Sequence, residues 1–132
     1  MTKVRHAGLS DYLLRSRIDP GEPRPDGSIV LVFDANMRVL LNPAPRGDLV
    51  LEAQVAELPA SRNTSDQMLD AALAAAGRRP AYEADCLALA SGGKRLVLQQ
   101  RVAAEASSEE FERGLGRFLD ALGAWRAQLG TL

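Results

Sequence analysis

The chain has few of the residues from which catalytic and metal-binding sites are usually built. Its 132 residues include one cysteine, one histidine and 5% aromatic residues. A single cysteine excludes an internal disulfide and is typical of a reducing compartment. We expect His6 to be an exposed residue near the N-terminus, because the sequence indicates no orienting partners for a triad or metal site. Cys86 is expected to be buried as a small hydrophobic side chain. The sequence therefore predicts no metal site and no cofactor.

Neither sign of charge dominates the chain, and no apolar run is long. Sixteen lysines and arginines against 17 aspartates and glutamates give a formal net charge of −1. This balance lacks the positive excess of proteins that bind nucleic acid or anionic membrane surfaces. The first residues carry positive charge but no apolar segment of a secretory signal, and no stretch approaches the length that spans a bilayer. We expect a cytoplasmic protein with no nucleic-acid or membrane partner.

The polar residues give no catalytic pattern either. Asp34 and Asp48 flank predicted turns, where aspartate commonly hydrogen-bonds to its own backbone, and this interpretation is preferred to a general acid–base pair. The stretch SGGKR lacks the spacing G-x-x-x-x-G-K-[ST] of a phosphate-binding loop and lies between two predicted strands. Because no cluster of polar groups with perturbable pKa values is evident, we expect a protein that is not an enzyme.

What the chain does have is hydrophobic side chains, at 46% of its residues, in a length suited to a single domain over residues 1–132. Residues 28–42, SIVLVFDANMRVLLN, predict a β-hairpin that turns at DAN. One face of this hairpin is wholly apolar and is expected to lie in the core: Ile29, Leu31, Phe33, Met37, Val39 and Leu41. The opposite face carries Val30, Val32 and Leu40 with one charge, Arg38, so a second apolar surface remains to be covered.

Three further strands are predicted. Alternation in residues 49–58 places Leu49, Leu51, Ala53 and Val55 on one face. Residues 85–106 predict a second hairpin that turns at Gly92-Gly93, with Leu89 opposite Leu96 and Leu87 opposite Leu98.

Three helices complete the pattern, over residues 8–18, 65–77 and from Ser107 to about Leu129. The middle helix follows a capping box of Thr64 and Gln67 and ends at Gly77, and the last follows a capping box of Ser107 and Glu110. The last helix carries a continuous apolar stripe: Phe111, Leu115, Phe118, Leu122, Trp125 and Leu129. The order helix, three strands, helix, two strands, helix predicts an α+β fold with a five-stranded antiparallel sheet.

The predicted sheet carries more apolar surface than the three predicted helices would cover in a monomer. The last helix can cover one face of the sheet, but a monomer would leave Val30, Val32, Leu40 and Val50 at least partly exposed, and such patches mark interaction sites. The alanine-rich middle helix suits close helix packing, including packing across a two-fold axis. The alternative is a compact monomer in which helices cover both faces of the sheet.

The order of elements resembles the small dimeric chaperones of type III secretion, class I, that serve single effectors. The resemblance runs from Leu9 to Leu129 and rests on these segments: DYLLRSRI, the Pro/Gly loop, IVLVFDANMRVLLN, LVLEAQVAEL, SDQMLDAALAAAG, LALASGGKRLVL and EEFERGLGRFLDALGAW. It implies a homodimer joined around the middle helix, through Met68, Leu69, Ala72 and Leu73, with Ala88 and Val97 as neighbours.

The resemblance also implies that a mostly unfolded N-terminal stretch of a secreted effector wraps around the dimer, inserting apolar side chains and adding a strand to the sheet. We expect the effector-binding surface to comprise Leu9, Leu13, Val30, Val32, Leu40 and Val50. Two alternatives remain: a small dimeric bacterial regulatory or peptide-binding module of similar fold outside secretion, and a small enzyme or ligand-binding domain with a polar pocket.

Overall fold

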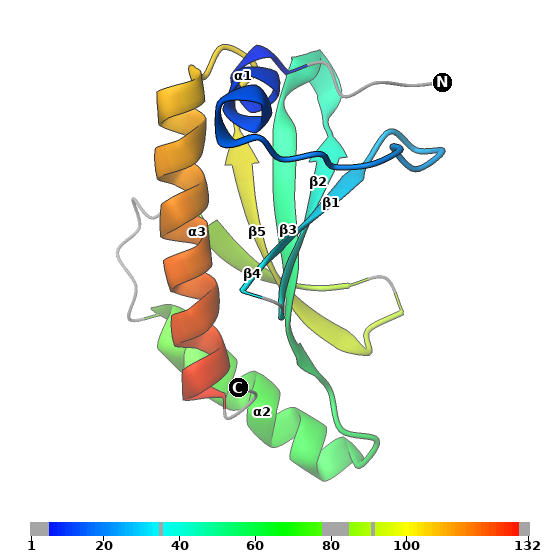
Figure 1. The fold of residues 1–132 in the computed structure, drawn as a ribbon. Coiled ribbons are helices and arrows are strands. Elements are labelled where there is room, and N and C mark those ends of the chain that lie inside the picture. Colours follow the sequence, from blue (N-terminus) through cyan, green and yellow to red (C-terminus); the bar gives the residue numbers. More distant parts are fainter. Residues whose placement is uncertain (1–5, 35, 78–84, 91, 130–132) are drawn as a thin grey trace.

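The computed structural model describes residues 6–34, 36–77, 85–90 and 92–129 of the chain, and its elements follow the predicted order (Figure 1). Within these residues, three α-helices, five strands and a short 3-10 turn follow one another in the order α1 (Ala7–Ser16), β1 (Ile29–Phe33), β2 (Met37–Pro43), η1 (Pro45–Gly47), β3 (Leu49–Glu57), α2 (Arg62–Gly77), β4 (Asp85–Leu89), β5 (Arg95–Val102) and α3 (Ser108–Gln128). The predicted α+β class is confirmed.

The five strands form one antiparallel sheet in the order β1-β2-β3-β5-β4. Both predicted hairpin registers are confirmed, since Leu31 lies opposite Val39 in the first hairpin and Leu87 opposite Leu98 in the second. At the second turn Gly92 and Gly93 both have positive φ, at 92° and 70°, a conformation that glycine adopts without steric cost. The strand β3 lies in the centre and pairs with β2 and β5.

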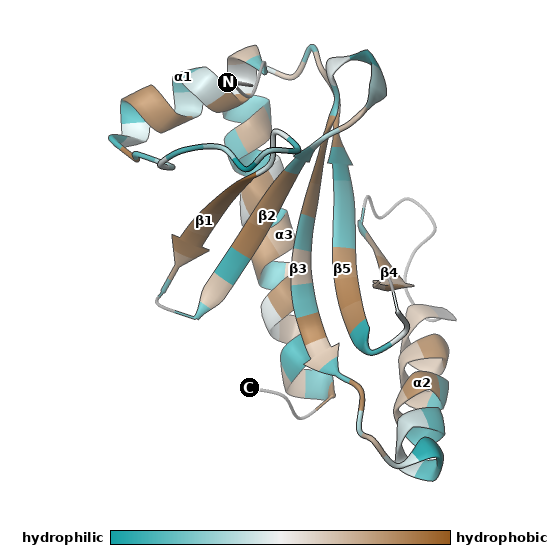
Figure 2. Ribbon diagram, turned by 90° about the vertical axis from the view of Figure 1, so that its right-hand side faces the viewer, coloured by the Kyte–Doolittle hydropathy of each residue, from teal (hydrophilic) through white to brown (hydrophobic). Residues whose placement is uncertain are grey.

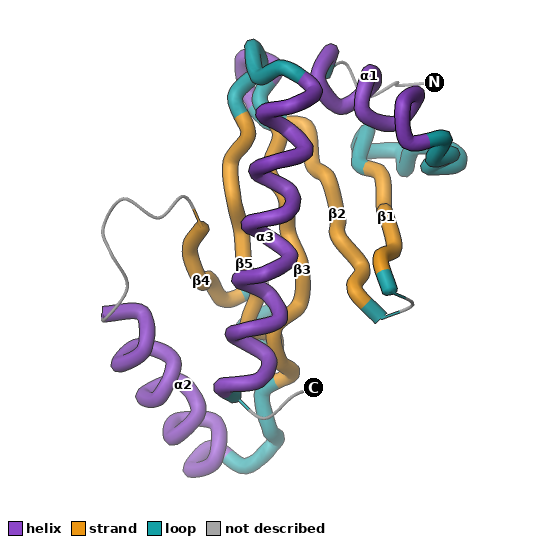
Figure 3. Tube along the Cα trace, turned by 60° about the vertical axis from the view of Figure 1, so that its left-hand side comes forward, coloured by secondary structure: helices purple, strands orange, loops and turns teal. Residues whose placement is uncertain are grey.

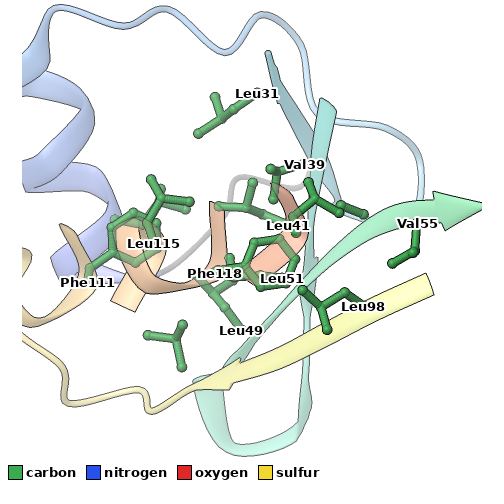
Figure 4. Close-up of a cluster of buried hydrophobic side chains, with 14 of the residues drawn as sticks. Leu31, Val39, Leu41, Leu49, Leu51, Val55, Leu98, Phe111, Leu115 and Phe118 are labelled. Atoms are coloured by element: carbon green, nitrogen blue, oxygen red, sulfur yellow. The ribbon is translucent and has the colours of Figure 1, made fainter. Parts of the chain in front are cut away.

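The helix α3 covers one face of this sheet and builds the core with it (Figure 4). The predicted capping box opens the helix, because the Ser107 hydroxyl accepts from the Glu110 N–H and the Glu110 carboxylate accepts from the Ser107 N–H. The large side chains of its stripe are buried against inward-facing leucines and valines of the sheet: Phe111, Leu115, Phe118, Leu122 and Trp125. Alternation along the strands therefore assigns one sheet face to the core.

The helix α1 packs against α3 and is anchored by His6, which the sequence analysis wrongly placed on the surface. The His6 ring is buried and caps the helix: Nδ1 accepts from the Leu9 N–H at 3.1 Å. Because Nδ1 accepts, Nε2 carries the hydrogen and donates to the Ala103 carbonyl at 2.7 Å. The bond to Ala103 ties the start of α1 to the segment before α3, a long-range contact that local sequence does not indicate.

The helix α2 begins earlier than predicted and contacts the core through Met68 and Ala75. It starts at Arg62, and the Ser61 hydroxyl faces the Thr64 N–H at 3.5 Å, so the predicted capping box at Thr64 is wrong. Its predicted end at Gly77 is confirmed. Figures 2 and 3 show α2 at the side of the sheet and at an angle to α3.

Cys86 is exposed, which corrects the expectation that it is buried. It lies in β4, an edge strand, and pairs with Gln99 on the sheet face opposite α3, whereas the adjacent Leu87 points toward the core.

No helix among the described residues has the length and apolarity needed to cross a bilayer.

Candidate functional site

The sheet face opposite α3 carries the four predicted strand residues together, and we call this surface the open face. Val30 lies opposite Leu40 in the β1–β2 pair, and Val50 lies opposite Asn42 in the β2–β3 pair. Figure 2 views the sheet from this side, with α3 behind it and apolar β1 at the edge. The side chain of Val32 is 56% exposed, and the other three are half-buried.

No described helix covers the open face. The helix α1 packs on α3, α3 packs on the core side, and α2 lies beside the sheet (Figures 2 and 3). The strand β1 pairs only with β2 among the described strands, so its outer edge has no neighbouring strand. An apolar face beside an open strand edge can accept an extended peptide, because the edge supplies backbone hydrogen bonds and the face supplies side-chain contacts.

The two residues predicted from α1 lie elsewhere. Leu9 is 1% exposed and belongs to the core, and Leu13 is half-buried against the same core on the α3 side of the sheet. The structure therefore does not bring them together with the open face. The exposed leucine of α1 is Leu14, at 79%, which the sequence analysis missed. The sequence could have indicated that Leu14 is exposed, because in a helix that buries Leu9 and Leu13 the residue after Leu13 points away from the core.

A cleft of about 370 Å³ opens on this face where β2 and β3 separate. Their pairing ends with Leu40 opposite Glu52, although both strands continue beyond that point. Apolar side chains and four arginines line the cleft: Arg24, Val30, Asn36, Arg38, Leu40, Glu52, Ala53, Gln54, Arg95, Val97 and Arg126. The arginines come from four separate segments of the chain, so no local motif could have indicated them.

Arg126 holds the two separated strands in place. Its Nε and Nη2 donate to the Gln54 carbonyl at 3.1 and 2.8 Å, and its Nη1 donates to the Asn36 carbonyl at 3.2 Å. Partial burial lowers the pKa of the Arg126 guanidinium from its ordinary value, but an arginine remains protonated at neutral pH. The cleft therefore keeps a fixed positive charge at its wall.

The residues predicted for the dimer interface lie on α2 and on the neighbouring strands. Leu73 is 71% exposed, Met68 and Leu69 are half-buried, and Ala72 is buried. On the strands Ala88 is half-buried, whereas Val97 is already buried at 2% exposure. Leu89, which lies opposite the buried Leu96 as predicted, is itself exposed at the end of the edge strand β4.

The aspartates that flank the turns have structural roles. Asp48 accepts from the Ala104 N–H at 2.8 Å and from Arg101 at 3.0 Å, which ties the start of β3 to the segment after β5. Asp34 adopts a left-handed φ of 48° in the first hairpin turn. Within the described ranges, no three histidine, cysteine, aspartate or glutamate residues form a group that could hold a metal ion.

A sequence model of the Tir chaperone protein (CesT) family matches residues 12–126 of this chain. No curated protein matches it. Among solved structures, the Yersinia pestis type III secretion chaperone SycH in complex with a stable fragment of YscM2 is similar at 14% identity. That match covers 92% of this chain and 98% of the other, with a TM-score of 0.64.

Two further structures have the same fold. The heterodimeric ExoU–SpcU complex from the type III secretion system of Pseudomonas aeruginosa matches at 12% identity, covering 91% of this chain and 96% of the other, with a TM-score of 0.67. YbjN from E. coli matches at 14% identity, covering 89% and 85%, with a TM-score of 0.63. At these identities the likeness establishes a shared fold.

Proposed function

The chain belongs to the Tir chaperone protein (CesT) family, and from this premise we propose that it is a type III secretion chaperone. In this proposal it binds the N-terminal chaperone-binding region of a secreted effector in the cytoplasm and keeps that protein soluble and competent for secretion. Structures with the same fold support it, since SycH is a type III secretion chaperone bound to a fragment of YscM2, and ExoU–SpcU is a complex of that secretion system.

The observation that carries the proposal is the open face. Val30, Val32, Leu40 and Val50 form an apolar surface that no described helix covers, and it lies beside the free edge of β1. An unfolded stretch of effector adds a strand at that edge and places alternate apolar side chains on the face. The client loses no structure of its own and remains extended for secretion. Binding of this kind needs neither a cofactor nor a metal.

A second copy of the chain completes the proposal. An isolated helix of 16 residues is only marginally stable in water, and α2 buries little beyond Ala72 and Ala75. Leu69 and the exposed Leu73, one helical turn apart, form an apolar side that packs against the same helix of a partner across a two-fold axis, whereas Met68 packs against the core of its own chain. Homodimerisation through α2 also brings two open faces to a single client.

The test is client capture by variants of the open face. The client is first identified by pull-down of the tagged protein from the native cell and mass spectrometry, and is then co-expressed with each variant. Val32→Asp and Leu40→Asp are expected to abolish co-purification, because each replaces an apolar contact of the client with a carboxylate that the bound client would have to desolvate. Leu14→Asp is the matched control, since it places the same charge on an exposed leucine outside the open face.

The outcomes separate the assignments. Loss of the client with both open-face variants and its retention with Leu14→Asp supports the surface. Retention of the client by Val32→Asp and Leu40→Asp would show that the site lies elsewhere. A protein that forms a dimer but captures no extended client would favour the alternative, a small dimeric regulatory or peptide-binding module outside secretion. YbjN supports that alternative only in having the same fold.

A further inference from the structure

Positive charge gathers in the cleft between β2 and β3, although the chain as a whole has a formal net charge of −1. Four arginines and one glutamate line it, beside the apolar side chains of Val30, Leu40 and Val97. The cleft therefore combines an apolar floor with a basic rim. A solvent-exposed apolar face alone would select for hydrophobic client residues. The arginines add a second requirement, which is negative charge on the client.

The acidic residues nearest this rim are Glu52, in the cleft lining, and Glu57, opposite Arg95, and neither forms an ion pair with Arg38 or Arg95. The Glu52 carboxylate accepts from the Gln99 amide at 2.7 Å. Arg38 and Arg95 are both exposed, and their side chains make no hydrogen bond or ion pair with another described residue. Arg126 is fixed on the Gln54 and Asn36 carbonyls, so it adds charge to the wall without closing the cleft. Arg38 and Arg95 are thus available to a ligand.

We propose that this cleft selects a client segment in which an acidic side chain stands two residues from an apolar one. The proposal rests on the proposed function and names the chemistry of the segment that binds. Along the first hairpin, the pair Val30 and Leu40 lies two residues from the pair Val32 and Arg38 on the same face. Alternate residues of an extended peptide share one face at the same spacing, about 6.7 Å apart. When an apolar residue of the peptide contacts Leu40, the residue two positions along the peptide lies near Arg38. An aspartate or glutamate at that second position reaches Arg38 and Arg95.

Selection from a random twelve-residue peptide library displayed to the purified full chain tests this requirement. We expect the selected sequences to be enriched in Asp or Glu two positions from Leu, Ile or Val. The enrichment disappears when the library is selected on the Arg38→Gln/Arg95→Gln double variant. It persists on Arg117→Gln/Arg62→Gln, the matched control, which removes two exposed arginines outside the cleft.

A double-mutant cycle then measures the contact directly on one selected peptide. Changing its acidic residue to the corresponding amide should weaken binding to the wild-type chain about fivefold, as expected for exposed ion pairs. The same change should have no effect on the Arg38→Gln/Arg95→Gln variant, and the effect on the wild-type chain should shrink in 0.5 M NaCl.

Other outcomes overturn the inference in distinguishable ways. Selected peptides without acidic enrichment, whose binding Leu40→Asp nevertheless abolishes, refute the acidic preference and leave the chaperone proposal standing. Failure of any peptide to be selected counts against both proposals. Displacement of a selected peptide by a random-sequence RNA oligonucleotide would assign the arginines to nucleic acid and refute a peptide carboxylate as their ligand.

Discussion

The helices α3 and α2 both carry an apolar stripe, yet α3 contributes five large side chains to the core and α2 contributes one alanine. The stripe of α3 consists of large side chains that pack against β3, β5 and α1, with Phe111, Phe118 and Leu122 fully buried. In α2 the buried side chains are Ala72 and Ala75, while Leu73 is 71% exposed. The two helices differ less in apolar periodicity than in the size of the side chains that reach the core.

The difference shows what an amphipathic pattern leaves undetermined. Burial of apolar area stabilises in proportion to that area, at about 25 cal/mol per Å², so alanines contribute far less than phenylalanine or leucine. The helix α2 contacts the core through Ala75 and Met68, and it leaves Leu73 exposed for another surface. The proposed partner of α2 is a second copy of the chain, whereas α3 has its partner in the sheet. Three predictions test this contrast.

The largest effect is expected in α3 from Phe118→Ala. Phe118 is fully buried against the sheet (Figure 4), and its truncation removes apolar contacts and leaves a cavity. We expect the free energy of unfolding to fall by about 3–5 kcal/mol, measured by urea denaturation followed by circular dichroism. Leu14→Ala is the control, because it truncates an exposed leucine and should change the free energy of unfolding by less than about 0.5 kcal/mol. Equal losses for both variants would contradict the assigned core.

The second effect concerns association through α2. Leu73→Arg places a charge in the proposed seam and is expected to yield a monomer by multi-angle light scattering, because two like charges meet across a two-fold axis. The chain itself should remain folded, since Leu73 supplies little to the core.

Ala71→Arg provides the matched control on the same helix. Ala71 is exposed and lies two positions from Leu73, which places it about 200° around the helix. This variant should keep the mass of the dimer. A dimer that survives Leu73→Arg would exclude α2 as the seam and would leave its exposed leucine without the proposed role.

Periodicity and turn chemistry predicted the architecture well, because those signals are local. The hairpin registers, the element order and the capping box at Ser107 all follow from residues close together in the sequence. One local signal failed, because α2 begins at Arg62 and the capping box at Thr64 does not form, and the other errors concern burial and long-range contacts. His6 is buried because it reaches Ala103, and Cys86 is exposed because β4 is an edge strand beside an uncovered face.

The same distinction applies to the candidate site. The open face was predictable, since alternation alone places Val30, Val32 and Leu40 away from the core. The basic cleft was not, because it depends on where β2 separates from β3 and on an arginine that arrives from α3. Leu9 was assigned to the surface because a four-residue spacing identifies one face of a helix without identifying which surface that face meets.

The smallest predicted effect is a pH dependence at the start of α3 that has no counterpart in α2. Hydrogen bonds from the Ser107 backbone and hydroxyl lower the pKa of the Glu110 carboxyl from its ordinary value. The folded chain therefore binds this proton less readily than the unfolded chain. The resulting stabilisation is fully present above the ordinary glutamate pKa of about 4.3 and is lost as the pH falls through the lowered value.

Glu110→Gln should consequently flatten the decrease in the free energy of unfolding between about pH 5 and pH 3, measured by urea denaturation at each pH. Glu109→Gln removes the same charge from the same helical turn but leaves the capping box intact, so it should retain more of that decrease. Identical pH profiles for the two variants would show that the charge near the helix N-terminus matters and that the reciprocal cap does not. A flatter profile for Glu110→Gln alone would assign the acid sensitivity of α3 to the cap, which α2, with only Ser61 at its start, does not share.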